Sequence, residues 1–374
     1  MVIITTREQK GSFMETIKSI VILFGGISSE HEVSCVSAAS VLEHIDREKY
    51  DIRTIGITKA GNWFLTDSPA SDISDGSWEQ DENNRRAFIV PDRGTGGIMA
   101  ENADGTFEVI RTDVVFPVLH GKNGEDGTMQ GLLQLAGIPF IGSDTAASSA
   151  SMDKAITKAM IEHRGYVDQA RCYVVHQTAY DRDRNAQLEA VNSFFADTYP
   201  LFIKPANAGS SVGISKVKRA EDLEKALDLA FAEDCKVLVE EAITGREIEV
   251  AVLGNEEPQA SCIGEIFAAN EFYDYNAKYE NSKSQTAIVR DLEPEKEQEI
   301  KDKAISVYET MGCSGMSRVD FFLEDGGRVV FNEINTLPGF TSISMYPKLW
   351  EASGIPYDEL IDRLIKLALD KYER

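Results

Sequence analysis

The stretch RVDFFLEDGGRVVFNEINTLPG at 318–339 shows the clearest structural pattern in the chain. Its apolar runs, 319–323 and 329–331, predict two β-strands. The residues EDGG at 324–327 predict a hairpin turn between them, because both glycines tolerate positive φ. The sequence therefore predicts an antiparallel hairpin, and the polar residues beside its apolar runs become candidates for a functional site.

Four polar residues of this hairpin are expected to face one surface, namely Arg318, Asp320, Glu333 and Asn335. Residues two apart in a strand point to the same side, so each strand contributes two of them. Carboxylate and amide oxygens suit Mg²⁺, which favours carboxylates shared with nucleotide phosphates. The neighbouring guanidinium suits a phosphoryl group or a developing oxyanion. The alternative is an ion-pair cluster on a solvated sheet, but this four-residue arrangement favours a metal and phosphate site.

The composition is that of a globular protein, with 43% hydrophobic and 27% charged residues among 374. This length favours two or three domains. The formal charge of −24 argues against nucleic acid or an anionic membrane as a main partner, because both require basic surface. No apolar run approaches the roughly 20 residues of a membrane span, and the first residues lack the hydrophobic core of an export signal.

The five cysteines are scattered and odd in number, and they form no C-x-x-C pair. This pattern predicts free thiols in a reducing compartment rather than disulfides or a zinc site. We therefore expect a cytoplasmic protein, with residues 1–18 forming an N-terminal extension.

The chain opens with a βαβ pattern, which predicts a parallel sheet covered by helices. We expect strands at 19–24 and 52–58 with a helix at 34–44 between them, and a further strand at 113–119. Residues 67–108 are rich in Ser, Asp, Asn and Gly, and they are expected to form an excursion on the domain surface. These elements predict an N-terminal Rossmann-like domain at 19–142.

Two further α/β units are expected, a central domain at 143–240 and a C-terminal domain at 241–374. After the residues SMDK at 151–154, a helix should run to about 163. The central domain should continue with strands at 201–203, 214–217 and 236–239 and a helix at 223–231. The C-terminal domain should contain strands near 247–253 and 260–266, a polar aromatic loop at 270–285, a helix at 294–312, the hairpin, and a helix at 357–372.

Lys204 ends an apolar strand directly before the Gly/Ser loop at 209–213. A strand-end lysine is usually solvated, but Gly209 and Gly213 permit close backbone approach and Ser210 adds a hydroxyl for a phosphate. The loop is not a Walker A sequence, and the glycines at 25–26 do not complete a dinucleotide-binding fingerprint.

Several other polar residues are candidates whose local patterns leave two interpretations open. Glu240 and Glu247 could accept hydrogen bonds from adenosine, or they could be ordinary surface carboxylates. Glu30 and His120 follow strands at the carboxyl edge of the first sheet, where open α/β sheets bind ligands. Glu30 suits an ammonium group, although a helix N-terminal acid is the alternative, and His120 could equally be structural. The loop around Tyr279 could be a lid that excludes water, or it could pack on a neighbouring domain.

Taken together, the chain resembles the D-alanine–D-alanine ligases of the ATP-grasp superfamily over nearly its whole length. The segments that carry this resemblance occur in the family's order: GGISSE at 25–30, LHGKNGEDGTMQG at 119–131, SMDK at 151–154, KPANAGSSVG at 204–213, YDYNAKY at 273–279, and NTLPGFTS at 335–342 following the hairpin. The resemblance implies a three-domain α/β ATP-grasp fold with ATP held between the second and third domains. It implies that ATP activates one D-alanine as an acyl phosphate and that a second D-alanine attacks it, giving D-alanyl-D-alanine for peptidoglycan synthesis.

The resemblance also implies residue roles. Asp320, Glu333 and Asn335 would hold two Mg²⁺ (or Mn²⁺) ions, and Arg318 with the Gly339 backbone would stabilise the oxyanion. Lys154 and Lys204 would contact the nucleotide phosphates, and adenosine would be contacted by Glu240, Glu241 (through its backbone), Ile243 and Glu247. Glu30, Ser210 and Tyr279 would form a set that binds the first D-alanine and orders the lid 270–285. Lys278 would contact the transferred phosphoryl group, His120 would lie beside the substrates, and Ser344 would contact the carboxylate of the second D-alanine.

Departures within the family leave the second substrate as the main alternative. D-alanine–D-lactate enzymes carry histidine in place of Tyr279, and D-alanine–D-serine enzymes differ near 340–346. Phe272, Tyr279 and Met345 favour the dipeptide. A regulatory nucleotide-binding protein without activity is a distant alternative, because such a copy would have lost residues of the hairpin set. A homodimer is expected from the family.

Overall fold

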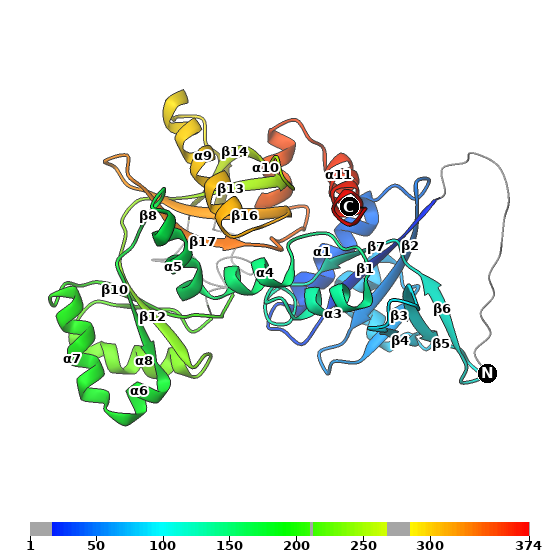
Figure 1. Cartoon of the computed structure of the whole chain (residues 1–374), viewed down its shortest axis with the longest axis horizontal. Helices are drawn as coiled ribbons and strands as arrows, with labels where there is room; N and C mark the ends of the chain where they lie inside the picture. The colour runs from blue at the N-terminus through cyan, green and yellow to red at the C-terminus, as the bar shows by residue number, and fades with distance from the viewer. Residues whose placement is uncertain (1–16, 210–211, 268–284, 374) are drawn as a thin grey trace.

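The computed structural model describes residues 17–209, 212–267 and 285–373. Within these residues the chain forms three β-sheets, each covered by helices, so the expected α/β architecture is confirmed. Figure 1 shows the first sheet on one side of the molecule, the third sheet beside it, and the second sheet in a separate lobe with α6, α7 and α8. No helix of the described residues is long and apolar enough to cross a membrane.

The first sheet has the order β6-β5-β4-β3-β2-β1-β7, and its centre is the expected βαβ unit. Strand β1 (Lys18–Gly25) pairs in parallel with β2 (Tyr50–Ile57) and with β7 (Val114–Val118). Residues 20–24 are fully buried, because helices cover a parallel sheet on both faces. Helix α1 (His31–His44) begins three residues earlier than the sequence predicts, with Glu30 as its N-cap residue.

The expectation of a surface excursion at 67–108 is wrong. This segment extends the first sheet with antiparallel strands, and its Trp78 is fully buried. A Cβ on Gly56 would lie 2.3 Å from the Trp78 ring, so the indole fills the space above β2. Each strand carries too few apolar residues to stand out in the sequence. The segment follows β3 (Trp63–Thr66) and contributes α2 (Ala70–Asp75), η1 (Ser77–Gln80), β4 (Arg85–Ile89), β5 (Gly97–Glu101) and the start of β6 (Phe107–Arg111). Helix α3 (Thr128–Ala136) completes the unit.

The second sheet has four antiparallel strands in the order β11-β10-β12-β9. Its elements are β9 (Cys172–His176), α6 (Gln177–Arg182), α7 (Arg184–Phe195), β10 (Leu201–Pro205), β11 (Ser215–Val217), η2 (Ala220–Asp222), α8 (Leu223–Phe231) and β12 (Lys236–Glu241). Alternate residues such as Ile203 and Val239 pack with the helices, which leaves Lys204 and Glu240 on the other face.

The third sheet has the order β15-β14-β13-β16-β17-β8. Its strands are β8 (Asp168–Gln169), β13 (Arg246–Gly254), β14 (Gln259–Phe267), β15 (Gln285–Ile288), β16 (Gly315–Leu323) and β17 (Val329–Asn335). The helices around it are α4 (Thr145–Met152), α5 (Lys154–Arg164), α9 (Pro294–Thr310), α10 (Met345–Ala352) and α11 (Tyr357–Tyr372).

The helix expected to run to about 163 is α5, and the sequence did not reveal α4 before it. Asp153 separates the two helices, and its carboxylate caps α5 by accepting from the backbone N–H groups of Ala155 and Ile156. Residues of α4 and α5, such as Ala147 and Ile161, pack in the core of the third sheet. The domain boundaries themselves stay a prediction.

The predicted hairpin is confirmed as β16 and β17, with Arg318 opposite Asn335 and Asp320 opposite Glu333. Of the two turn glycines, only Gly327 adopts positive φ (81°). The pairing contains a β-bulge that the sequence did not reveal: Phe321 pairs with Phe331, so Asn332 is the extra residue on β17.

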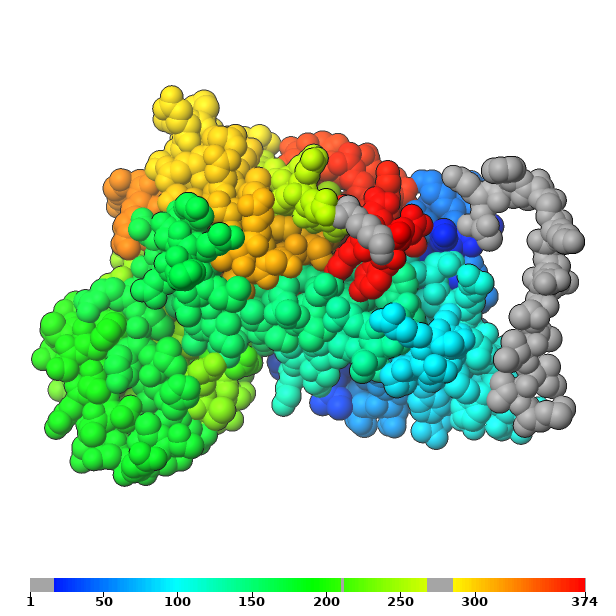
Figure 2. All heavy atoms as spheres, in the orientation of Figure 1, coloured from blue at the N-terminus to red at the C-terminus, as the bar shows by residue number. Residues whose placement is uncertain are grey.

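The first and third sheets share one apolar core, which joins residues of β1 and β7 to Phe340, Tyr346 and Trp350. The second sheet has its own core with α6, α7 and α8. Figure 2 shows the corresponding green lobe projecting from the rest of the molecule. The polar face of the second sheet and the hairpin of the third sheet therefore meet between these two bodies.

Candidate active site

A cleft lies where the hairpin, the first sheet's carboxyl edge, α5 and the loop after β10 converge. Its wall includes Glu30, His120, Lys154, Arg318 and Gly339. A second cavity of about 690 Å³ continues from it between β12 and β13. The two share a boundary formed by Lys204, Ile214, Glu247, Ile266 and Asn332. The two cavities therefore adjoin one another, the first lined by Glu30 and the second by Glu240 and Glu241 of the second sheet.

The hairpin presents its charged residues to this cleft as a connected set. Arg318 donates from Nε and Nη2 to the two carboxylate oxygens of Asp320, at 2.7 and 2.6 Å. Its Nε also lies 3.1 Å from Glu249 of β13, and Asn335 donates to Asp320 at 3.1 Å. Burial by itself would lower the pKa of Arg318, but Asp320 and Glu249 outweigh it and hold that pKa well above its usual range. The guanidinium is therefore a permanent, rigidly oriented cation.

The acidic residues around the hairpin create a local excess of negative charge. Burial, and then repulsion from Asp320 and Glu333, raise the pKa of Glu247 to about 7. Carboxylates held this close are relieved by a cation, and their oxygen chemistry fits Mg²⁺ or Mn²⁺. Within the described part of the chain, no three acidic, histidine or cysteine side chains form a complete metal site. The predicted set Asp320, Glu333 and Asn335 fits the group only with further oxygen ligands.

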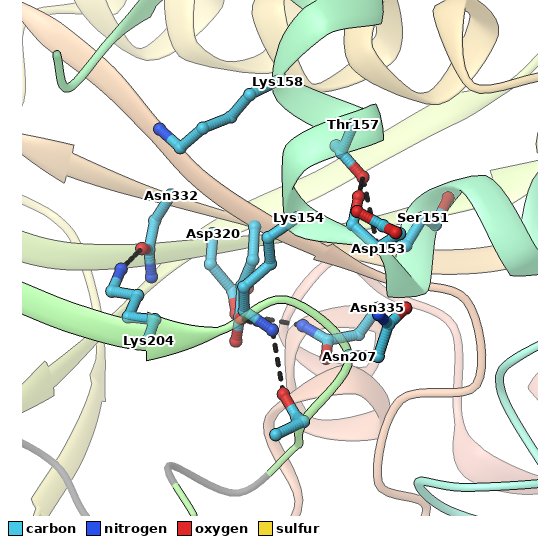
Figure 3. Close-up of polar contacts among 12 residues, drawn as sticks. Ser151, Asp153, Lys154, Thr157, Lys158, Lys204, Asn207, Asp320, Asn332 and Asn335 are labelled. Carbon is cyan, nitrogen blue, oxygen red and sulfur yellow. Dashed lines mark hydrogen bonds and ion pairs between the residues drawn. The ribbon is translucent and has the colours of Figure 1, made fainter. Parts of the chain in front are cut away.

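Lys154 reaches the cleft from the first turn of α5 (Figure 3). Its Nζ donates to the carbonyl of Ala208 at 2.9 Å and lies 3.4 Å from Glu333. Its backbone N–H donates to Ala206 in the segment that follows β10, at 3.0 Å. The helix break at Asp153 starts α5 at this point, and it therefore places Lys154 between the second sheet and the hairpin.

Lys204 lies deeper in the cleft, where it contacts both neighbouring sheets. Its Nζ lies 2.7 Å from Glu240 and donates to Asn332 at 3.1 Å. The second oxygen of Glu240 lies 2.7 Å from Lys158 of α5. Burial alone would raise the pKa of Glu240, but the two ammonium groups outweigh it and lower this pKa to about 2. The side chain expected to bind adenosine is therefore engaged by two lysines.

The remaining predicted adenosine residues lie around the second cavity. Ile243 and Glu247 line it, and Glu241 lines it while accepting from the backbone N–H of Arg171 at 2.9 Å. Arg246 borders the same cavity and forms paired hydrogen bonds with Glu265 of β14 and with Asp291 after β15. These contacts fix one wall of the cavity to the third sheet. We expect nucleotide contacts here to come from the backbone around 241–243 and from Glu247.

Glu30 and His120 meet at the opposite end of the cleft. The Glu30 carboxylate lies so close to Gly121 and Gly209 that an added Cβ would fall 2.6 and 2.8 Å from it. Glu30 is the N-cap residue of α1 but makes no side-chain cap hydrogen bond, so it lies at the helix N-terminus while its carboxylate faces these two glycines. His120 contacts the Ser37 hydroxyl and the Leu337 carbonyl, each at 3.2 Å.

Glu125, whose side chain is 15% exposed, is a further residue at this end of the cleft that the sequence analysis overlooked. It lies 3.6 Å from His120 Nδ1. Burial chiefly raises the pKa of Glu125, the neighbouring His120 opposes this, and Glu30 raises it further. Its position five residues after His120, in the same glycine-rich turn, was the available signal.

Of the remaining predicted site residues, Gly339 and Ser344 lie in the described part of the chain. Gly339 lies in the cleft wall, whereas Ser344 hydrogen-bonds the Thr341 N–H at 3.0 Å and its hydroxyl at 2.8 Å. Ser210, Lys278 and Tyr279 fall outside the described residues, as do Phe272 and most of the loop 270–285.

Three polar residues joined to the site were also missed: Lys158, Glu249 and Asn332. Lys158 lies one helical turn after Lys154, and that i, i+4 spacing predicts that both lie on one helix face. Glu249 lies opposite Asp320 in the ladder of β13 and β16, a pairing that the sequence alone does not specify. Asn332 turns toward Lys204 at the bulge.

Comparison with known proteins gives a consistent result. Family models described as the D-ala D-ala ligase N-terminus and C-terminus match residues 19–143 and 163–366. The chain is 47% identical to a curated D-alanine--D-alanine ligase of Ruminiclostridium cellulolyticum, covering 95% of this chain and 96% of that one. It is 49% identical to another of Caldicellulosiruptor bescii, covering 94% and 95%.

Two solved structures are similar over almost their full length. One is the VanG D-Ala:D-Ser ligase of Enterococcus faecalis, with a TM-score of 0.83, 39% identity, and 94% and 99% of the two chains covered. The other is the D-alanine-D-alanine ligase of Coxiella burnetii, with a TM-score of 0.82, 36% identity and 95% of each chain covered.

Proposed function

Because the chain belongs to the D-alanine–D-alanine ligase family, we propose that its cleft uses ATP to join two D-alanine molecules into D-alanyl-D-alanine, with release of ADP and phosphate. The chain is an ADP-forming ligase of this family, and its product would serve peptidoglycan synthesis. One observation carries the proposal: a single cleft joins Glu30, the lysines Lys154 and Lys204, and the Arg318–Asp320 hairpin.

The reaction needs an activated carboxyl group, because a carboxylate and an amine do not condense spontaneously in water. Transfer of the ATP γ-phosphoryl group to the first D-alanine would form an acyl phosphate and ADP. The amine of the second D-alanine would then attack the acyl carbon, and the tetrahedral intermediate would collapse with loss of phosphate. Each step requires that water be kept from the reacting carbon.

The nucleotide would lie along the two joined cavities with its phosphates at the boundary between them. Lys154 and Lys204 supply positive charge there. Asp320, Glu333 and Asn335 would hold Mg²⁺ or Mn²⁺, which when bound neutralises and orients the phosphates. The adenine base would occupy the cavity lined by Ile243, where it would meet backbone groups.

The amino-acid substrates would lie at the other end of the cleft. Glu30 would accept hydrogen bonds from the ammonium of the first D-alanine, which the carboxylate's position against Gly121 and Gly209 supports. Arg318 donates to Asp320 through Nε and one Nη2 hydrogen, so its Nη1 group and its other Nη2 hydrogen could donate to a tetrahedral oxyanion together with the Gly339 N–H. His120 would lie beside both substrates. Ser210, Lys278, Tyr279 and Ser344 keep the roles that the resemblance implies.

The test is incubation with ATP, Mg²⁺ and D-alanine, alone or with an equal concentration of D-serine or D-lactate. Mass analysis of the products identifies the second substrate directly. We expect D-alanyl-D-alanine to predominate in every mixture. A predominant D-alanyl-D-serine or D-alanyl-D-lactate product would assign the chain to the alternative specificity, and absence of ADP formation with any acceptor would contradict ligase activity. The similarity to a D-Ala:D-Ser ligase structure makes the D-serine arm essential.

We also expect the enzyme to act in the cytoplasm as a homodimer. Both expectations rest on the family. Light scattering of the purified chain at micromolar concentration would give the mass of the particle, and a mass near 41.3 kDa would contradict the dimer.

A further inference from the structure

Lys158 is a buried lysine that no cleft-lining role accounts for. It projects from α5 one turn after Lys154, and 8% of its surface is exposed. Figure 3 shows Lys158 on the same helix as Lys154. The Lys158 ammonium lies 2.7 Å from one carboxylate oxygen of Glu240. Burying an ammonium costs free energy even when it has a counter-ion, because both charges lose their hydration. The burial of Lys158 beside Glu240 therefore calls for an explanation.

The geometry makes Glu240 a bridge between two lysines. Its oxygens lie 2.7 Å from Lys158 and 2.7 Å from Lys204, so each ammonium contacts a separate oxygen. Asn332 accepts a hydrogen bond from Lys204 at 3.1 Å, which gives this ammonium a second fixed contact. Lys158, Glu240 and Lys204 come from α5, β12 and β10, so the bridge also joins the helix to the second sheet.

The charges of this bridge determine what a phosphate would meet at Lys204. Two ammonium groups and one carboxylate leave a net charge of 2 − 1 = +1. Without Lys158 the sum is 1 − 1 = 0, and the whole negative charge of Glu240 would face Lys204. A phosphate would then have to compete with that carboxylate for the same ammonium, and it would meet repulsion from the carboxylate.

We propose that Lys158 is a positioning residue for nucleotide binding, which neutralises Glu240 so that Lys204 keeps its charge available for the ATP phosphates. This inference rests on the proposed function, since it deepens the role of Lys204. Lys158 does not contact the nucleotide in this arrangement; it acts through Glu240. The raised pKa of Lys204, in which burial is opposed and outweighed by Glu240, is consistent with a lysine that stays charged in the site.

The experiment compares ligands that differ in their phosphates. Binding of ADP with Mg²⁺ and binding of adenosine are measured by calorimetry for the wild type, Lys158→Met and Lys158→Arg. In Lys158→Met we expect ADP affinity to fall about tenfold, the scale of one charge-assisted hydrogen bond, while adenosine affinity changes less than about twofold. In turnover assays KM for ATP should rise more than kcat falls. Lys158→Arg, which retains the charge, should recover ADP affinity.

The double variant Lys158→Met/Glu240→Gln gives the sharpest test, because it removes one positive and one negative charge and restores a net charge of +1. It should bind ADP more tightly than Lys158→Met does, although it carries one more substitution. Lys301→Met is the matched control, since Lys301 pairs with Glu297 on α9 and should leave both affinities unchanged.

Three results would overturn the inference. The first is an equal loss of ADP and adenosine affinity in Lys158→Met, and the second is an unchanged ADP affinity in the same variant. The third is weaker ADP binding by Lys158→Met/Glu240→Gln than by Lys158→Met. Lys158→Gln repeats the comparison if the methionine variant does not fold. A wild-type chain that binds no ADP would overturn the proposed function itself, which separates that failure from failure of the Lys158 role.

Discussion

Glu240→Gln tests how strongly the charged bridge stabilises the fold. The substitution keeps the size of the side chain and removes its charge, while the buried Lys158 and the 13% exposed Lys204 side chain remain on either side. Removing one partner of a buried ion pair leaves an uncompensated charge, which is far more costly than replacing the whole pair by apolar residues. We therefore expect destabilisation rather than a neutral change.

The pKa of Glu240 gives the magnitude. Burial raises it and the two lysines lower it, so that it falls from an ordinary value of 4.5 to about 2. A factor of ten in acid dissociation corresponds to about 1.4 kcal/mol, so the ionised carboxylate contributes about 3 kcal/mol to stability at neutral pH. Because the pKa is lowered in the folded state, this contribution is complete above pH 4.5 and is lost progressively as the pH falls toward 2.

Amide hydrogen exchange on β10 and β12 is the appropriate assay, because it reports opening of the second sheet without assuming that the whole chain unfolds together. At pH 7 the free energy of opening in Glu240→Gln should lie about 3 kcal/mol below that of the wild type. Urea unfolding of both proteins at pH 7, 4.5 and 3.5 should show the difference shrinking below pH 4.5.

Glu241→Gln is the matched control. Its carboxylate accepts one exposed hydrogen bond from the Arg171 backbone among the contacts of the described residues, so the substitution should change stability by less than about 1 kcal/mol. Equal opening free energies for Glu240→Gln and the wild type at pH 7, or a difference independent of pH down to 3.5, would refute the reasoning.

Three further predictions address other parts of the molecule. Glu333→Ala should reduce ADP formation at least about a hundredfold while leaving the circular dichroism spectrum unchanged, because it removes a proposed metal ligand; substantial turnover would count against the metal assignment. Gly209→Ala should raise KM for D-alanine about tenfold, since its Cβ would fall 2.8 Å from Glu30, whereas Gly326→Ala, with no atom nearby, should not; equal KM values would place the ammonium elsewhere. Trp78→Ala should lower the free energy of unfolding by about 3–5 kcal/mol in denaturant titrations, and a loss below 1 kcal/mol would show that the first sheet does not depend on this ring.

The elements with strong local patterns were predictable from the sequence. The βαβ opening, the helix at 294–310, the terminal helix at 357–372 and the hairpin all follow from apolar periodicity bounded by proline or glycine. The convergence of Arg318 with Asp320 followed from the two-residue period of a strand. These predictions needed only interactions between residues close together in the chain.

The features that the sequence did not predict depend on contacts between distant segments. Residues 67–108 form sheet strands because each short strand pairs with a neighbour, although none is apolar enough to be recognised alone. Glu249 joins the hairpin set through its register with β16, and Asn332 through a bulge that adds one residue to β17. Pairing register and bulges are set by packing of the whole sheet, which a local pattern does not encode.

The two interfaces of the cleft differ in their chemistry, and this difference bears on how the site works. The first and third sheets are joined by a shared apolar core, which holds the substrate end in fixed geometry. The second sheet is joined to the third largely through polar contacts, such as those of Lys204 with Asn332 and of Lys158 with Glu240. Water and phosphate can replace polar contacts, but they cannot replace an apolar core. Nucleotide binding is therefore expected to alter the attachment of the second sheet while Glu30, His120 and Arg318 keep their relative positions.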